Sequence, residues 1–249
     1  MRSTLRPWIG GLLDFFFPRY CIVCDDVLSE SEQYVCVKCF MTMPRTGFHL
    51  EHDNIMEKSL WGKIPIGRAT SFMFYKEYFK EIVLSLKYRH KHSIGIYIGM
   101  LMAKEISSES DFFNGIDAIV PIPIHWKRKL HRGYNQSYYL AKGLHFVTGI
   151  PIYDNVVRRT VNNPSQTRMN RSERKTNVEN IFRCHAPEQL RGKHILLLDD
   201  VRTTGATSIS CAISILKALG EYNEKGANVS GSVKISILTL AIAGKTMYK

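Results

Sequence analysis

The sequence is poor in acidic residues and in proline, and it has no apolar run long enough to cross a membrane. It contains 22 Asp and Glu against 34 Lys and Arg, a net charge of +12. Only 9 of the 249 residues are proline and 45% are hydrophobic, so the composition excludes a wholly disordered chain. The excess of positive charge favours a polyanionic partner, either a phosphorylated small molecule or a nucleic acid.

The candidate targeting segment is a short apolar stretch from Trp8 to Phe17. It is about ten residues long, roughly half of what a membrane-spanning helix needs, and Asp14 interrupts it. It also lacks a small-residue cleavage site, so we expect neither a signal peptide nor a membrane span. Ile9, Leu13 and Phe16 share one helical face, which predicts a short helix packed on the same protein; peripheral membrane contact is the alternative.

Four of the six cysteines form two Cys-x-x-Cys pairs near the amino terminus. Cys21, Cys24, Cys36 and Cys39 are spaced Cys-x2-Cys-x11-Cys-x2-Cys, and each pair places two thiolates on a tight turn. Four sulfurs close a tetrahedron around Zn²⁺ and leave no open coordination position, which predicts a structural zinc ion. Two disulfides are the alternative, but without secretory features the spacing favours metal and a reducing, cytoplasmic setting.

The pattern along the chain predicts a small amino-terminal unit followed by a larger α/β domain. Residues 1–48 hold the first helix and a zinc-ribbon-like four-cysteine module, 49–59 have linker character, and 60–249 form the second domain. In that domain apolar strands alternate with helices, which predicts a mostly parallel, twisted sheet flanked by helices. We expect strands at 67–76, 118–122, 152–157, 194–198 and 233–242, helices at 78–88, 93–106, 135–147 and 206–219, and a long basic loop at 158–180.

The segment with the most specific chemistry runs from Ile195 to Thr207. An apolar strand ends in Asp199 and Asp200, and a loop rich in threonine then leads into a helix. A helix amino terminus with free N–H groups binds anions, and Gly205 permits a close approach of the backbone. Acids beside such a loop would repel a phosphate, so we expect them to accept hydrogen bonds from sugar hydroxyls. An ordinary threonine-capped helix is the alternative, and it leaves the acid pair unexplained.

A second charged segment follows the strand predicted at 118–122. Because ligands of open α/β sheets bind beyond the carboxyl ends of the strands, this segment and the threonine loop can face one crevice. Its lysines and arginines suit a pyrophosphate group, with Arg132 and Gly133 the favoured pair. A solvated run of charge is the alternative for Lys127 to Lys129.

The segment from Ile195 to Thr207 resembles the phosphoribosyl pyrophosphate (PRPP) motif of type I phosphoribosyltransferases. That motif has four apolar residues, two acids, two further residues and then Thr-Thr-Gly-x-Thr, as here. The resemblance implies that Asp199 and Asp200 hold the ribose 2′ and 3′ hydroxyls. It also implies that the 5′-phosphate is held by Thr203, Thr204, Gly205, Ala206 and Thr207.

The order of motifs along nearly the whole chain resembles the ComF family of ComFC-like and GntX-like proteins. The shared features are the four-cysteine module, Leu86-Lys87-Tyr88, Pro-x-Pro from Pro121, Arg-Gly-Tyr-Asn-Gln from Arg132, the basic loop and the PRPP motif. By this resemblance Lys87 takes the place of a pyrophosphate-binding loop, and the larger domain has a type I phosphoribosyltransferase-like fold. Arg202 departs from the family, since many members have an uncharged residue before the threonines.

The resemblance implies a transferase that displaces pyrophosphate from ribose C1, with Mg²⁺ on the phosphates and an acceptor that the sequence does not identify. Asp199 and Asp200 would fix the ring, and Arg132 would stabilise the departing pyrophosphate. The alternative is a competence-associated DNA-uptake factor that binds single-stranded DNA, meets competence-machinery proteins, and keeps the PRPP site as a regulatory or vestigial feature. DNA binding of this kind needs exposed aromatic rings among basic residues, for which the candidates are Trp126, Tyr134, Tyr138 and Tyr139. Tyr138 and Tyr139 fall in an expected helix, where packing in the core is the favoured role.

Overall fold

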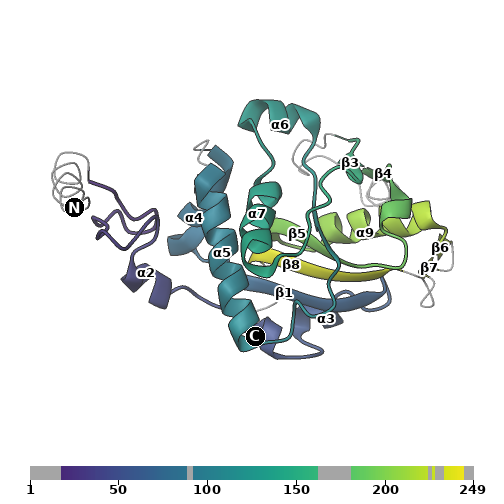
Figure 1. Cartoon of the computed structure of the whole chain (residues 1–249), viewed down its shortest axis with the longest axis horizontal. Coiled ribbons are helices and arrows are strands. Elements are labelled where there is room, and N and C mark those ends of the chain that lie inside the picture. Colours follow the sequence, from purple (N-terminus) through teal and green to yellow (C-terminus); the bar gives the residue numbers. More distant parts are fainter. Residues whose placement is uncertain (1–17, 89–91, 162–180, 224–225, 228–232, 244–249) are drawn as a thin grey trace, which may run out of the picture.

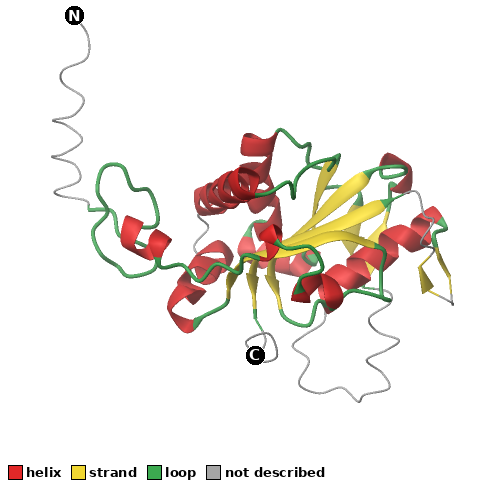
Figure 2. Ribbon diagram, turned by 90° about the horizontal axis from the view of Figure 1, so that it is seen from below, coloured by secondary structure: helices red, strands yellow, loops and turns green. Residues whose placement is uncertain are grey.

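The centre of the molecule is a four-stranded parallel sheet with helices on both sides (Figures 1 and 2). The computed structural model describes residues 18–88, 92–161, 181–223, 226–227 and 233–243. The first expected helix and most of the expected basic loop lie outside these residues. The strands, in the spatial order β1, β8, β5, β2, are β1 (Ile66–Phe74), β8 (Lys234–Ile242), β5 (His194–Arg202) and β2 (Ala118–Pro121).

Strand β5 is apolar on both faces because helices cover both sides of the sheet. Leu196 and Leu198 belong to one core cluster, whereas Ile195 and Leu197 belong to the other. Successive side chains of a strand point to opposite faces, so the two clusters are separated by the sheet. Such nearly continuous apolar runs are typical of parallel strands buried on both faces.

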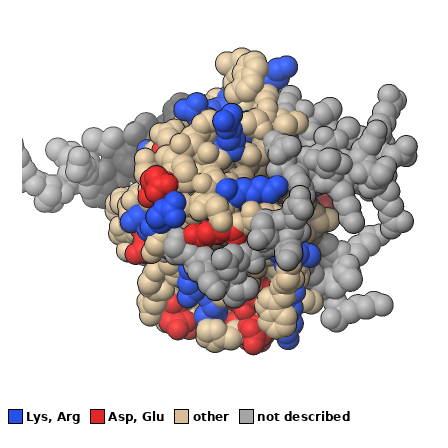
Figure 3. All heavy atoms as spheres, turned by 90° about the vertical axis from the view of Figure 1, so that its right-hand side faces the viewer, with Lys and Arg blue, Asp and Glu red and all other residues tan. Residues whose placement is uncertain are grey.

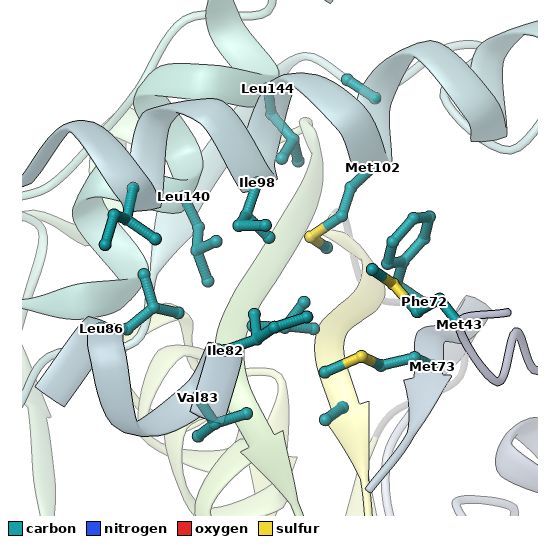
Figure 4. Packing of buried hydrophobic residues seen from close by; sticks show 14 of the residues in the cluster. Met43, Phe72, Met73, Ile82, Val83, Leu86, Ile98, Met102, Leu140 and Leu144 are labelled. Carbon is teal, nitrogen blue, oxygen red and sulfur yellow. The ribbon is translucent and has the colours of Figure 1, made fainter. Parts of the chain in front are cut away.

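Three helices cover the first face: α4 (Lys80–Tyr88), α5 (His92–Glu109) and α7 (Gln136–Thr148). Helices α5 and α7 cross at a close contact between glycines, where a Cβ on Gly99 would lie 2.2 Å from the Leu140 carbonyl oxygen. Figure 4 shows Ile82 and Leu86 of α4 facing Leu140 of α7 across this core. These contacts fix α4 and α7 beside the sheet, and α7 begins next to the carboxyl end of β5.

The second face is covered chiefly by α9 (Ala206–Leu219), and Met56 of α3 (Ile55–Lys58) belongs to the same core. Helix α9 begins after Gly205 and ends before Gly220, both of which have positive φ angles, of 79° and 76°. Glycine adopts that conformation without strain, so these two residues set both ends of the helix. The structure confirms the range expected for α9 from the sequence.

Short elements complete the described fold. They are α2 (Val37–Met41), α6 (Trp126–Arg132), the 3-10 turns η1 (Phe48–Leu50), η2 (Glu77–Phe79) and η3 (Pro187–Gln189), and the antiparallel pairs β3 (Val157–Arg159) with β4 (Phe182–Cys184) and β6 (Tyr222–Asn223) with β7 (Gly226–Ala227). Within the described parts of the chain, no helix combines the length and apolar character needed to span a bilayer.

The α/β class with a mostly parallel sheet is confirmed, but two local expectations are wrong. Residues 152–157 are not a strand of the main sheet: only Ile152 forms a bridge, to Ile119, and the chain then pairs with β4 in a separate two-stranded sheet. Residues 49–59 are not a bare linker, because Asn54 caps α3 and Met56 and Glu57 are buried. The division into domains at 1–48 and 60–249 stays a prediction.

Candidate functional site

The carboxyl end of β5 and the amino end of α9 form a polar edge of the sheet. Asp199, Asp200 and Arg202 lie in the last four residues of β5, and Thr203 and Thr204 follow as an exposed turn. Gly205 then starts α9. The first amides of a helix have no intrahelical acceptor, and the helix dipole makes this end positive. The edge therefore combines negative carboxylates with an adjacent site suited to anions.

The two aspartates have different surroundings. Asp199 Oδ1 accepts hydrogen bonds from Ser137 Oγ of α7 at 3.3 Å and from the Asp200 amide at 2.9 Å. Asp200 Oδ2 lies 3.2 Å from Lys87 Nζ at the end of α4, and its Oδ1 accepts from the Val201 amide at 2.8 Å. The fold thus brings Lys87 to the acid pair, although Lys87 lies more than one hundred positions earlier in the chain.

The pKa of Asp199 is strongly displaced. Burial, and then the negative charge of Asp200, raise it from 3.8 to about 8, while Ser137 and Lys87 act in the opposite direction. A carboxyl group with such a pKa holds a proton over much of the neutral range. The acid pair therefore accommodates one negative charge more readily than two. A bound cation or a hydroxyl donor would favour the state in which both carboxyl groups are ionised.

Beneath the threonine turn lies the Arg202 side chain, which is only 3% exposed. Its Nη2 donates to Ser59 Oγ at 2.7 Å, and its Nη1 donates to Ser208 Oγ at 3.4 Å. A Cβ placed on Gly205 would lie 2.5 Å from the Arg202 Cζ atom. Glycine at 205 is thus required both by its positive φ and by the guanidinium below it.

A hollow of about 540 Å³ lies between α6, the start of α7 and the segment that leads into β3. Its walls contain aromatic rings together with cations, namely Trp126, Tyr138, Tyr139, Lys129, Arg158 and Arg159. Burial and the neighbouring Arg128 lower the pKa of Arg159, and Asp199 counteracts this, so Arg159 lies within electrostatic range of the acid pair. Gly133, which ends α6 with φ 79°, also lines this hollow.

Arg132 is the last residue of α6, and every side chain of that helix is at least partly exposed. Figure 1 shows α6 projecting from the body of the fold above α7. On the face drawn in Figure 3, the described Lys and Arg side chains are interspersed with acidic and uncharged ones. The positive side chains on that face thus form no single continuous patch among the described residues.

The four cysteines of the amino-terminal pairs converge. The sulfur atoms of Cys21, Cys24, Cys36 and Cys39 all lie within 4.8 Å of one another, and all six cysteines of the chain are free. Cys24 Sγ and Cys36 Sγ are 3.7 Å apart, which matches the edge of about 3.8 Å that a tetrahedron with metal–sulfur bonds of about 2.3 Å would have. The cluster thus has the number, type and geometry of ligands for a tetrahedral metal ion.

Backbone amides support the thiolate form of Cys21, whereas burial raises the pKa of Cys24, to about 11, and that of Cys39. Val23 N lies 3.5 Å from Cys21 Sγ, and Cys36 N lies 3.4 Å from the same sulfur. Burial alone would raise the pKa of Cys21, but hydrogen bonds from backbone groups outweigh it, and the pKa is lowered. Cys39 N also donates to Cys36 Sγ at 3.4 Å, so these amides orient the sulfurs before any ion is considered.

The four-cysteine module packs directly on the larger part of the molecule. Tyr34 OH donates to Ser93 Oγ of α5 at 2.7 Å. Arg45 forms two hydrogen bonds to the Glu105 carboxylate, at 2.6 and 2.7 Å, and Met43 points into the first core cluster (Figure 4). Order in the module is therefore linked to packing around α5.

The structure brings together part of the predicted site. Asp199, Asp200 and Lys87 are in contact, and the loop from Thr203 to Thr207 follows them directly. Gly133 lines the hollow beside α6, and Arg132 is the last residue of that helix. Ser137 was not predicted from the sequence, although it directly follows Arg-Gly-Tyr-Asn-Gln and lies in the first turn of a helix at the sheet edge. Arg158 was likewise not predicted as a wall of the hollow.

These features define a class: an α/β protein with a parallel sheet, an acid pair and threonine turn at its carboxyl edge, and a four-cysteine module. No protein-family model matches the chain. It is 27% identical over 210 residues to "DNA utilization protein YhgH" of Salmonella typhimurium, covering 80% of this chain and 92% of that protein. It is 26% identical over 191 residues to "Competence protein ComFC" of Bacillus subtilis, with coverage of 76% and 74%.

A shorter match, 31% identical over 105 residues, is to "Competence protein F" of Haemophilus influenzae, and it covers 42% of this chain and 45% of that protein. The names of these relatives refer to DNA utilization and competence, and the four-cysteine cluster is present in the structure. Together they support the resemblance of the chain to the ComF family.

Proposed function

We propose that the chain binds PRPP, or a closely related sugar phosphate, at the carboxyl end of β5. The observation that carries this proposal is the direct succession of Asp199, Asp200 and the exposed threonine turn at the amino end of α9. Carboxylates accept hydrogen bonds from ribose hydroxyls, and the turn offers amides and hydroxyls to a phosphate. One edge of the sheet thus supplies both halves of a site for a phosphorylated ribose.

The residues divide the ligand between them. Asp199 and Asp200 hold the 2′ and 3′ hydroxyls, and residues 203–207 hold the 5′-phosphate. Lys87, whose Nζ lies 3.2 Å from Asp200 Oδ2, would exchange that partner for the pyrophosphate. Mg²⁺ bound to the phosphates would supply additional charge neutralisation, which suits a site where two carboxylates meet a polyanion.

The proposed reaction is transfer of the phosphoribosyl group to an acceptor. The bond between ribose C1 and the pyrophosphate oxygen breaks, a bond from C1 to the acceptor forms, and the acceptor loses a proton. Positive charge develops on the ring, so the nearby carboxylates stabilise it, while Arg132 and Lys87 stabilise the departing pyrophosphate. Catalysis of this kind depends on positioning and charge, and it needs no covalent intermediate on the protein.

The binding test compares the wild type with Asp199→Asn/Asp200→Asn by calorimetric titration with PRPP and Mg²⁺. We expect at least about a hundredfold loss of affinity, because two charged hydrogen-bond acceptors are removed. Glu188→Gln is the control, since this exposed glutamate lies far from the site in an i,i+3 ion pair with Arg191. Equal PRPP affinity of the double variant and the wild type would rule out the assignment. Pyrophosphate release with a panel of bases and amines then identifies the acceptor.

We further propose, as a second candidate function, binding of single-stranded DNA at the aromatic and basic hollow. Trp126 is 61% exposed, and the walls combine rings for base stacking with cations for phosphates. The names of the relatives refer to DNA utilization and competence, which favours a function in DNA binding. We include proteins of the competence machinery among the proposed partners on the same basis.

The DNA test uses a fluorescent oligothymidylate. Trp126→Ala is expected to weaken binding about tenfold, and Trp61→Ala, at a tryptophan 52% exposed elsewhere, serves as the matched control. Affinity should also fall steeply with salt, because phosphate contacts release counterions. Equal effects of the two tryptophan variants, or an affinity independent of salt, would remove this candidate.

For the cysteine cluster we propose a structural Zn²⁺. Four thiolates close the coordination sphere, and the module that they hold packs on α5 through Tyr34. Zinc here would order a surface next to the larger domain and would take no direct part in the transfer reaction.

A further inference from the structure

Arg202 is a buried cation whose recorded hydrogen bonds end on neutral groups. The side chain is 3% exposed, and the two hydrogen bonds of its guanidinium go to the hydroxyls of Ser59 and Ser208. Its Nε atom is buried and has no hydrogen-bond partner among the described residues. Within the same part of the chain, no carboxylate forms an ion pair with it.

This charge persists near neutral pH. Burial lowers the pKa of Arg202 to about 10, which still leaves the guanidinium protonated. Removing a charge from water without a counter-charge is costly, so buried ions are ordinarily paired. An uncompensated arginine at this position therefore requires a reason beyond packing.

The place of the guanidinium supplies that reason. It lies against the backbone of Gly205, since a Cβ there would be only 2.5 Å from Cζ, and Ser208 Oγ connects it to the Gly205 carbonyl at 3.0 Å. Gly205 directly precedes α9, a helix of 14 residues whose positive end points to the same turn. The Arg202 guanidinium and the positive end of α9 thus meet at the same turn. An anion bound on the outer side of the turn would stabilise both.

We propose that Arg202 is a buried counter-charge that makes the turn at residues 203–207 selective for a dianionic phosphate monoester. The inference rests on the proposed function and names the charge state of the ligand that the turn prefers. Arg202 acts through the turn and does not touch the ligand, so it is a positioning residue. A purely structural role, in which Arg202 only holds the turn in shape, is the competing explanation.

Two probes of the same shape separate these explanations: ribose 5-phosphate, a dianion at pH 8, and ribose 5-sulfate, a monoanion. The wild type should bind the phosphate at least about tenfold more tightly than the sulfate. Arg202→Met should reduce that ratio several-fold, whereas Arg202→Lys, which keeps the charge, should retain most of it. Arg183→Met, at an exposed arginine of β4, is the control and should leave the ratio unchanged.

Thermal unfolding without ligand gives an independent readout. Because an uncompensated buried charge is removed, Arg202→Met should keep or raise the unfolding temperature, while the stabilisation by ribose 5-phosphate becomes smaller. A structural role predicts the opposite: a lower unfolding temperature, including outright failure to fold, and equal loss of affinity for both probes. Either of those results overturns the proposal.

The outcome for the wild type distinguishes this inference from the proposed function. If the wild type binds neither ribose 5-phosphate nor PRPP, both fail. If it binds ribose 5-phosphate and ribose 5-sulfate equally, the phosphoribose site stands and the role of Arg202 is wrong.

Discussion

The four-cysteine cluster and the acid–threonine edge are both formed by residues close in sequence, yet they differ in how completely they are assembled. The four sulfurs already lie within 4.8 Å of one another, and backbone amides orient them. At the sheet edge Asp199 contacts Ser137 and Asp200 contacts Lys87, whereas Thr203 and Thr204 face solvent. The first arrangement suits an ion that stays bound, and the second suits a ligand that enters and leaves.

The largest effect is expected from breaking the closed cluster. Cys36→Ser removes one ligand of the proposed zinc ion and the sulfur that accepts from Cys39 N at 3.4 Å. Structural zinc binding in small modules provides on the order of 10 kcal/mol, so this variant should lose zinc and order in the module. Metal analysis and thermal unfolding provide the measurement, and Cys184→Ser, outside the cluster, is the control. Full zinc content and an unchanged unfolding temperature in Cys36→Ser would contradict a closed metal site.

An intermediate effect is expected from the titration of Asp199. Its pKa is raised from 3.8 to about 8 by burial and by Asp200, so the native state binds this proton more strongly than the unfolded state does. The stabilisation from the bound proton is therefore complete below about pH 4 and is lost as the pH rises through 8. Denaturant unfolding from pH 5 to pH 9 should show this decline, and Asp199→Asn should flatten it.

Denaturant unfolding of the two proteins at pH 9 shows directly whether the charge of Asp199 stabilises or destabilises the fold. Asp199→Asn should be more stable than the wild type there, since it removes a partly buried negative charge beside Asp200. If the stability of the wild type instead rises from pH 5 to pH 9, Asp199 ionises in the folded protein without a loss of stability. The acid–threonine edge would then differ less from the four-cysteine cluster.

The smallest effect on stability is expected at Arg132. Helix α6 presents all of its side chains at least partly to solvent, so Arg132→Gln should change the free energy of unfolding by no more than about 0.5 kcal/mol. The affinity of the Arg132→Gln variant for pyrophosphate should nevertheless fall, because a cation near the leaving group is lost. A large loss of stability, or unchanged pyrophosphate affinity, would show that Arg132 belongs to the fold and not to the open site.

Local signals explain why much of the fold could be predicted. The helix expected at 206–219 matches α9 because Gly205 and Gly220 end it on either side, and β5 and β8 are apolar runs of typical strand length. Residues 152–157 were wrongly predicted as one strand, because the polar residues Asp154 and Asn155 interrupt their apolar run. Their pairing with β4 depends on a segment some 25 residues later, which no local pattern reveals.

The candidate site divides in the same way. The acid pair, the threonine turn and the cysteines are contiguous motifs, so their chemistry could be read from the sequence. The contact of Lys87 with Asp200 and that of Ser137 with Asp199 arise only when α4 and α7 pack on the sheet. Arg202 could be noticed as an unusual residue, but its burial depends on the room left beneath Gly205.

The most direct measurement of the central claim is an NMR titration of ¹⁵N-labelled protein with ribose 5-phosphate. We predict saturable shifts of the amide resonances of residues 203–207, at ligand concentrations where the resonances of α6 stay unchanged. Amide shifts confined to α6 and the hollow, or no saturable shift in the turn, would contradict a sugar-phosphate site at the end of β5.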